Sequence, residues 1–178
     1  MKVSERQLGL SAQVPQQQVL RFRLQPDLDL ETAIEIDRVT ELISIPLDRV
    51  VPMPHLPPAV MGVYNWRGEI LWIVDFSQLL GLEVARARQH STTLKPAIVL
   101  SHLITGGETI SLGLVVDKIE EIESCNTELI QQIDSTRTNR MGIEPIWIKG
   151  YCRSNTDAEL LVLNRQTIFN CTQLQSNI

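Results

Sequence analysis

The 178 residues suffice for one good core, or for two small cores that share an interface. The formal net charge of −5 argues against a general nucleic-acid binder, which needs a basic face for phosphate. No apolar run is long enough to span a membrane, and the polar N-terminal residues lack the apolar centre of a signal peptide, so we expect a cytoplasmic protein.

The N-terminal part of the sequence is polar and then shows short strand patterns. Residues 1–18 are rich in glutamine and have little to bury, which predicts a flexible arm. Val19–Leu24 alternates apolar and basic residues, which predicts a half-buried strand with Arg21 and Arg23 facing outward. Thr32–Leu42 continues as a second strand or as a strand that runs into a turn.

A hairpin follows a proline-rich connector. Ile45–Pro58 contains five prolines, which forbid a regular helix and favour an extended chain. Val60–Leu82 then predicts a strand, a tight turn, a second strand and a short helical turn. Asp75 is placed to cap that helix, and Gly81 is placed to end it.

The hairpin turn is the stretch best suited to contact a partner. Asn65 and Gly68 accept positive φ angles and bracket the tip. We therefore expect Trp66 and Arg67 to lie side by side in solvent. Both residue types are frequent among the few side chains that dominate binding energies.

The second half of the chain has the same kind of pattern. Residues 83–95 are polar and basic without an apolar period, which predicts an exposed linker, and 171–178 is a polar tail. Asn164 is placed to cap a last helical turn. The other predicted elements are a strand beginning at Pro96–Leu100, strands over Ile110–Ile122, Trp147–Tyr151 and Glu159–Leu163, and a short helix over Glu128–Ile133.

The two halves resemble each other. Ile34–Leu42 aligns with Leu114–Ile122, with an offset of 117 − 37 = 80 residues at the matched aspartates. Gly62–Asp75 aligns with Gly150–Asn164, and each segment ends at a helix cap. A duplicated all-β unit implies two small barrels with a shared core, since each alone is too small to be comfortably stable.

The repeat also predicts domain boundaries. We expect a first barrel over about 19–82 and a second barrel over about 96–170. The second copy has Arg153–Asp157 in place of the Trp-Arg turn. The unrepeated tip of the first copy is therefore expected to carry the specific function.

The cysteines Cys125, Cys152 and Cys171 are odd in number and far apart in the sequence. Such usage fits free thiols in a reducing compartment better than a disulfide framework. No His and Cys cluster has zinc spacing, and no glycine-rich loop suits phosphate, so we expect no metal and no cofactor.

The connector and the hairpin resemble the CheW-like domain family, whose hallmark is a Gly-Val-x-Asn-Leu-Arg-Gly turn. The similarity extends from about Val19 to Phe169 and includes Gly113–Asp117 in the second half. The residues that carry it most clearly are Val51-Pro52-Met53-Pro54, Pro57, Gly62-Val63, Asn65-Trp66-Arg67-Gly68 and Ile73-Val74-Asp75-Phe76.

The resemblance implies an all-β fold of two intertwined five-stranded SH3-like barrels with a shared hydrophobic core and short helical turns. It also implies a non-enzymatic adaptor that couples methyl-accepting chemoreceptors to a CheA-like histidine kinase. Family members serve flagellar chemotaxis or type IV pilus-based twitching and phototaxis. The implied location is the cytoplasm, including membrane-associated receptor arrays, with self-association in the array left open and no direct membrane insertion.

Site residues follow from the same resemblance. Val39 and Glu41 fall on the Val-x-Glu positions that line the receptor-facing groove, and Arg67 is the turn arginine used around binding surfaces. Gly62, Asn65 and Gly68 hold the turn. Two departures enlarge the apolar surface near the tip: Trp66 replaces the usual Leu, and Trp72 stands where the family often has Pro.

These residues also have simpler interpretations. Arg67 could brace its own turn, Trp66 could fold back over its own barrel, and Glu41 could be a solvated carboxylate at a strand end. Trp72, inside a strand, is expected in the core. Asp75 is expected to cap a helix rather than act as a catalytic acid.

A small-barrel nucleic-acid binder is the alternative function. It requires six basic residues to gather on one face, and steep salt dependence would distinguish it from the adaptor. These residues are Arg21, Arg23, Arg86, Arg88, Arg137 and Arg140. An enzyme ranks third, because no constellation of residues in the sequence supports one.

Overall fold

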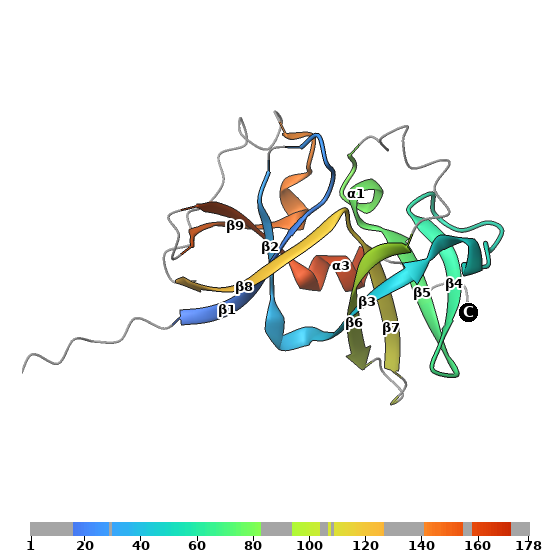
Figure 1. The fold of residues 1–178 in the computed structure, drawn as a ribbon. Helices are drawn as coiled ribbons and strands as arrows, with labels where there is room; N and C mark the ends of the chain where they lie inside the picture. Colours follow the sequence, from blue (N-terminus) through green and yellow to red (C-terminus); the bar gives the residue numbers. More distant parts are fainter. Residues whose placement is uncertain are drawn as a thin grey trace, which may run out of the picture.

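The computed structural model describes residues 16–28, 30–82, 94–103, 107, 109–126, 141–154 and 158–171. Within these residues the strands form two five-stranded sheets that lie side by side (Figure 1). The all-β fold expected from the repeat and from the family resemblance is therefore confirmed.

The first sheet has the order β8-β1-β2-β10-β9, and the second has the order β3-β6-β7-β5-β4. The strands of the first sheet are β1 (Gln16–Arg23), β2 (Thr32–Glu35), β8 (Lys118–Asn126), β9 (Ile148–Arg153) and β10 (Glu159–Leu163). Those of the second are β3 (Val39–Pro46), β4 (Val60–Trp66), β5 (Glu69–Asp75), β6 (Leu94–Leu103) and β7 (Thr109–Val115). Short helical segments are η1 (Ile36–Arg38), η2 (Leu47–Arg49), α1 (Phe76–Leu79), η5 (Pro145–Trp147) and α3 (Arg165–Cys171).

The two sheets have the same architecture. Replacing β8, β1, β2, β10 and β9 by β3, β6, β7, β5 and β4 converts one strand order into the other. The parallel pair β2–β10 of the first sheet corresponds to the parallel pair β7–β5 of the second. The repeat recognised in the sequence is thus a repeat of structure.

The barrels are not consecutive in the chain, which corrects the predicted boundaries of 19–82 and 96–170. The first sheet takes β1 and β2 from the N-terminal part and β8, β9 and β10 from the C-terminal part, and the second takes the five strands between them. The chain changes sheets between β2 and β3 and again between β7 and β8. These two crossings lie in the aligned segments Ile34–Leu42 and Leu114–Ile122. The boundaries were predicted wrongly because a local sequence pattern does not show that the chain passes from one sheet to the other.

Some predicted element boundaries also change. The single strand expected over Ile110–Ile122 is interrupted at Val116 and Asp117, because the chain crosses between the sheets there. β1 already begins at Gln16, inside the predicted arm, and Leu94 and Lys95 of the predicted linker belong to β6. The helix expected over 128–133 lies outside the described residues, as do residues 1–15 and 83–93.

The core confirms the expected sharing between the barrels. The largest apolar cluster joins Leu20 and Phe22 of the first sheet to Val74, Ile98 and Leu112 of the second. Each sheet also has a smaller cluster of its own. The two barrels therefore bury a common interface and stabilise each other.

Both predicted helix caps are present. The Asp75 carboxylate accepts a hydrogen bond from the backbone N–H of Gln78 at 3.1 Å, and Gly81, with φ +87°, follows the end of α1. The Asn164 side chain accepts from the N–H of Gln166 at 3.2 Å at the start of α3. The caps occupy matching positions after β5 and β10, as the repeat requires.

The cysteine prediction was wrong for two of the three residues. Cys125 and Cys152 form a disulfide, with 6.2 Å between their Cα atoms. Cys125 lies on β8 and Cys152 on β9, the two edge strands of the first sheet, which come together as the sheet curls. A sequence separation of 27 residues carries no sign of this proximity. The side chain of Cys171 is outside the described part of the chain.

Gly62 is required by close backbone packing. Its φ is +142°, and an added Cβ would lie 2.1 Å from the carbonyl oxygen of Val51. Two hydrogen bonds between Val51 and Val63 hold the connector at this distance from β4, with N to O distances of 2.8 and 2.9 Å.

We expect Gly62→Ala to lower the free energy of unfolding by about 3 kcal/mol, because it combines backbone strain with a clash. Gly68→Ala is the matched control: Gly68 also has positive φ, but an added Cβ meets nothing within 4 Å. Its expected loss is about 1 kcal/mol. Urea unfolding of both variants measures the difference, and equal losses would contradict the packing argument.

Candidate functional site

The β4–β5 hairpin ends in a two-residue turn. Arg67 has φ +56° and Gly68 has φ +87°, and Trp66 pairs with Glu69 at the base of the turn. The Asn65 side-chain oxygen accepts a hydrogen bond from the Gly68 N–H at 3.0 Å. The prediction that Asn65 itself provides the positive φ is therefore corrected, because Arg67 takes that conformation and Asn65 braces the turn.

Arg67 is held between a carboxylate and an indole ring. Its guanidinium nitrogen Nη2 lies 2.7 Å from Oε1 of Glu41, and its Cζ lies 5.2 Å from the ring centroid of Trp66. The Arg67 side chain remains 68% exposed. The arginine is therefore accessible and already oriented.

Trp66 does not project into solvent beside Arg67, as the sequence predicted. It is half-buried and packs against the core cluster of the second barrel. The alternative interpretation, in which the ring folds back over its own barrel, is the one observed. Trp72 is also half-buried and packs against the shared core.

The Glu41–Arg67 pair spans the two edges of the second sheet. Glu41 lies on β3 and Arg67 follows β4, and these strands stand at opposite ends of the strand order. The contact therefore forms where the curled sheet closes. Gly62 does not take part in this contact. It is buried against the connector, where it allows close backbone packing.

A chain of hydroxyl groups runs beside Glu41. The Thr40 hydroxyl donates to Ser101 Oγ at 2.9 Å, and Ser101 Oγ lies 3.0 Å from Ser111 Oγ. These contacts link β3, β6 and β7. These contacts were not predicted from the sequence, because the three hydroxyl residues lie on different strands and are far apart in the chain.

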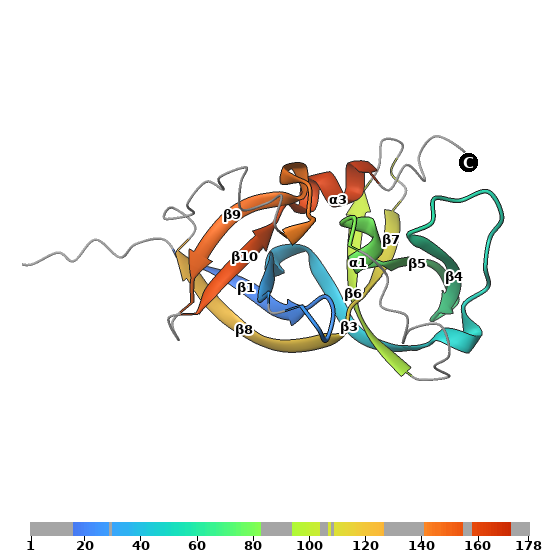
Figure 2. The ribbon, with the colours of Figure 1, turned by 90° about the horizontal axis from the view of Figure 1, so that it is seen from above.

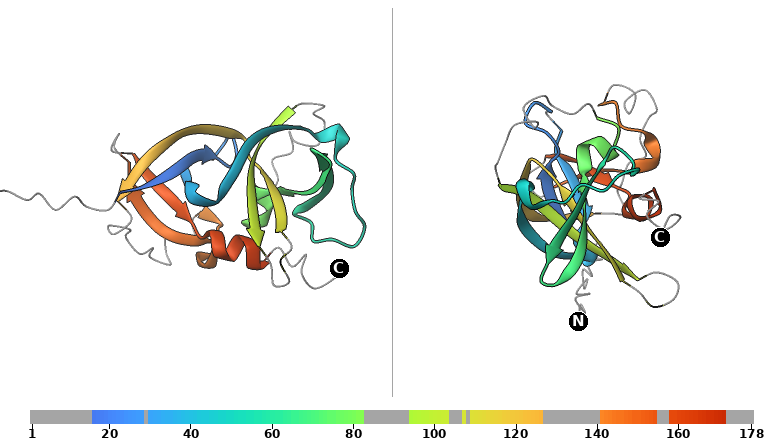
Figure 3. Two further views of the ribbon diagram at one scale, coloured as in Figure 1. Left: turned by 90° about the horizontal axis from the view of Figure 1, so that it is seen from below. Right: turned by 90° about the vertical axis from the view of Figure 1, so that its right-hand side faces the viewer.

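Four apolar residues of β3 and β8 form what we call the apolar strip: Val39, Leu42, Ile119 and Ile122. Leu42 is 42% exposed and Ile122 is 50% exposed, while Val39 and Ile119 are partly buried against the shared core. Their pairing partners Leu100, Ile98, Phe22 and Leu20 all belong to that core, which puts the four on the same side of their sheets. β3 and β8 run along one side of the molecule, opposite α3 (Figures 2 and 3).

Of the apolar strip, the sequence analysis identified only Val39. The internal repeat could have found the others, because Val39 aligns with Ile119 and Leu42 aligns with Ile122 at the offset of 80 residues. The strip thus contains both copies of the same two positions.

The basic residues of β1 do not form a phosphate-binding face. Arg21 lies 2.6 Å from Glu123 and 3.1 Å from Glu121, and Arg23 lies 3.3 Å from Glu31. The nucleic-acid alternative therefore loses two of its arginines to ion pairs, and its other four lie outside the described residues.

The ion pairs around Arg21 and Arg23 also affect the pKa of one carboxyl group, that of Glu120. The hydrogen bond from Lys118 to Glu120, together with the positive charges of Lys118, Arg23 and Arg21, lowers the pKa of Glu120 below its usual value. Because the folded pKa is depressed, this stabilisation is present above the ordinary glutamate pKa and is lost as the pH falls through the folded value.

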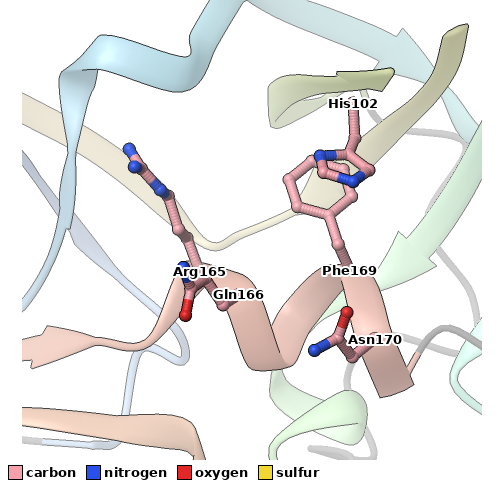
Figure 4. A pocket seen from close by; sticks show the side chains of 5 residues that line it. All are labelled: His102, Arg165, Gln166, Phe169 and Asn170. Atoms are coloured by element: carbon pink, nitrogen blue, oxygen red, sulfur yellow. The ribbon is translucent and has the colours of Figure 1, made fainter. Parts of the chain in front are cut away.

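A cavity of about 280 Å³ lies between β6 and α3 (Figure 4). It is lined by His102, Arg165, Gln166, Phe169 and Asn170. The rings of His102 and Phe169 stack at 4.8 Å, and Arg165 pairs with Asp37 and Glu35. The His102–Phe169 contact joins α3, which follows the first sheet, to β6 of the second, and the Arg165 ion pairs join α3 to β2 and η1.

Two kinds of feature are absent from the described part of the chain. It contains no group of three or more His, Cys, Asp or Glu residues placed to hold a metal ion. None of its helices combines the length and the apolar character needed to cross a membrane.

Comparison with known proteins agrees with this geometry. The CheW-like domain family matches residues 18–171.

This chain belongs to the CheW-like domain family.

It is 26% identical over 170 residues to the chemotaxis protein CheW of Treponema pallidum (strain Nichols), covering 96% of this chain and 92% of that protein. It is 36% identical over 80 residues to the chemotaxis protein CheW of Rhizobium meliloti (strain 1021), covering 45% of this chain and 46% of that protein.

The fold is that of a solved CheW. The crystal structure of scaffolding protein TtCheW from Thermoanaerobacter tengcongensis superposes with a TM-score of 0.63 at 17% identity, covering 84% of this chain and 90% of that chain. Together with the two five-stranded sheets, this confirms the predicted pair of SH3-like barrels. Trp66 distinguishes this CheW-like chain from the leucine of the family hallmark.

We expect the Glu41–Arg67 pair to contribute less than about 1 kcal/mol to stability, because both side chains contact solvent, which screens the attraction. A double-mutant cycle with Glu41→Gln and Arg67→Gln, followed by chemical unfolding, measures the coupling. A coupling above about 2 kcal/mol would make the pair a main stabilising contact of the barrel instead of a surface feature.

Proposed function

We propose that this CheW-like chain is a non-enzymatic chemotaxis adaptor that couples a methyl-accepting chemoreceptor to a CheA-like histidine kinase in the cytoplasm. Family membership and the names of its relatives support this function. The observation that carries the proposal is the apolar strip, together with the oriented Glu41–Arg67 pair on the other side of the same edge strand, β3. Such a surface suits the binding of another protein without any chemical step.

The apolar strip is the proposed docking surface for the helical hairpin tip of the receptor. Leu42 and Ile122 expose apolar surface, and burying it would favour association. Glu41 and Arg67 would make directional contacts with polar groups of the receptor. Because the structure already orients Arg67, little side-chain freedom is lost on binding.

The kinase is proposed to pair its own homologous regulatory domain with one barrel of this chain. The shared core then couples the two events, since a movement of one barrel displaces the other. The signal would pass as a shift in contact geometry between two states of different affinity. Flagellar motility and type IV pilus-based motility or phototaxis are both compatible outputs, as is self-association in receptor arrays.

The nucleic-acid alternative is disfavoured by the ion pairs of Arg21 and Arg23. It makes a different prediction about salt, because phosphate binding weakens steeply as salt is added. Docking on an apolar strip weakens far less.

We expect Arg67→Glu to weaken binding to a receptor hairpin fragment by at least about tenfold, because it places two carboxylates together beside the edge strand β3, which also carries Leu42. Arg49→Glu, in η2 at the other end of β3, makes the same charge change as a control and should retain native affinity. Calorimetry with both variants measures this. Native affinity for Arg67→Glu would exclude the turn from the contact.

We expect Leu42→Asp and Ile122→Asp each to weaken the same binding by about tenfold or more, since each places a charge within an apolar contact. Leu94→Asp is the matched control, because Leu94 is 60% exposed but lies outside the strip. Circular dichroism verifies that the three variants fold. If all three lose affinity equally, or none does, the strip is not the docking surface.

A further inference from the structure

A covalent bond closes the first barrel. The edge strands β8 and β9 are not neighbours in the hydrogen-bonded order of the sheet, and the Cys125–Cys152 disulfide links them. Cys125 is fully buried and Cys152 is 4% exposed. Both belong to the smaller core cluster that lies within the first barrel alone.

Among the described residues, the smaller core cluster of the first barrel has smaller side chains than that of the second. Its buried members other than the cysteines are Val19, Ala33, Leu160 and Val162, and the one partly buried residue described around it is Ala158. The corresponding cluster of the second barrel is surrounded by larger side chains, including Tyr64, Trp66 and Met61. Within the part of the chain that the structure describes, the disulfide is thus the largest group in the first barrel's own cluster.

The internal repeat shows what replaces the disulfide in the second barrel. Cys125 aligns with Ile45 at the offset of 125 − 45 = 80 residues. Cys152 aligns with Tyr64, because 152 − 64 equals the offset of 150 − 62 = 88 between Gly150 and Gly62. Ile45 is buried and Tyr64 packs in the same cluster. The equivalent positions of the second barrel thus hold apolar side chains of one cluster, so the architecture itself does not require a disulfide.

We propose that Cys125 and Cys152 form a redox-responsive closure of the first barrel. In the oxidised state the disulfide fixes β8 to β9. In the reduced state the two buried thiols pack as small apolar side chains, and the barrel persists with a looser edge. This device is independent of the proposed docking function, although β8 also carries Ile119 and Ile122.

Oxidation of the two thiols is balanced when another disulfide acts as the oxidant. The two thiols lose two protons and two electrons and form one S–S bond, while one molecule of oxidised glutathione accepts them and becomes two molecules of glutathione. The exchange runs through a mixed disulfide. Because both sulfur atoms are buried, the β8–β9 edge must open transiently before exchange can occur.

The test equilibrates the full chain with reduced or oxidised glutathione, alkylates the remaining thiols after unfolding, and records a thermal melt of each form. Oxidised protein should have one alkylated cysteine, Cys171, and reduced protein should have three. The oxidised form should melt about 10 °C above the reduced form.

Two variants sharpen the result. Cys171→Ser should keep the shift in melting temperature, and the double variant Cys125→Val with Cys152→Ala should abolish it. If the double variant fails to fold, the comparison of oxidised and reduced native protein still decides. Three free thiols after oxidation, a pairing that involves Cys171, or equal melting temperatures of the two forms would overturn the proposal.

Discussion

The fold depends on two crossings of the chain from one sheet to the other. β2 leads into β3, and β7 leads into β8, so the first sheet combines strands from both ends of the chain, while the second is built from the continuous stretch between the two crossings. The first barrel therefore cannot form from one continuous piece of chain. The apolar faces meet between the sheets and bury Phe22 together with Val74 and Leu112. The two barrels therefore stabilise each other through this shared core.

The crossings also create the candidate site. Val39 and Leu42 follow one crossing, and Ile119 and Ile122 follow the other, so the repeat places equivalent apolar residues at the junction of the barrels. The turn that carries Arg67 lies at the closing edge of the second barrel and contacts Glu41 on β3. The edge strand β3 thus carries part of an apolar surface on one side and an oriented ion pair on the other, and both features suit protein docking.

Much of this was accessible from the sequence, and the parts that were not share a cause. The repeat, the helix caps at Asp75 and Asn164, and the hairpin at Arg67 depend on local chemistry or on alignment within the chain. The membership of each sheet, the disulfide and the burial of Trp66 depend on pairings between distant strands, which leave no local pattern. The exposed residues Leu42 and Ile122 could have been found by extending the aligned Val39 and Ile119 along the repeat.

The proposed docking mode requires the strip on β3 and β8 to bind a receptor hairpin as a single surface. The most direct measurement is backbone amide chemical-shift mapping of the full chain during titration with a receptor hairpin fragment. The account predicts that amides of β3 and β8 shift together, at one affinity, along with the turn at Arg67. Shifts confined to the connector before β4, or to only one of the two strands, would contradict it.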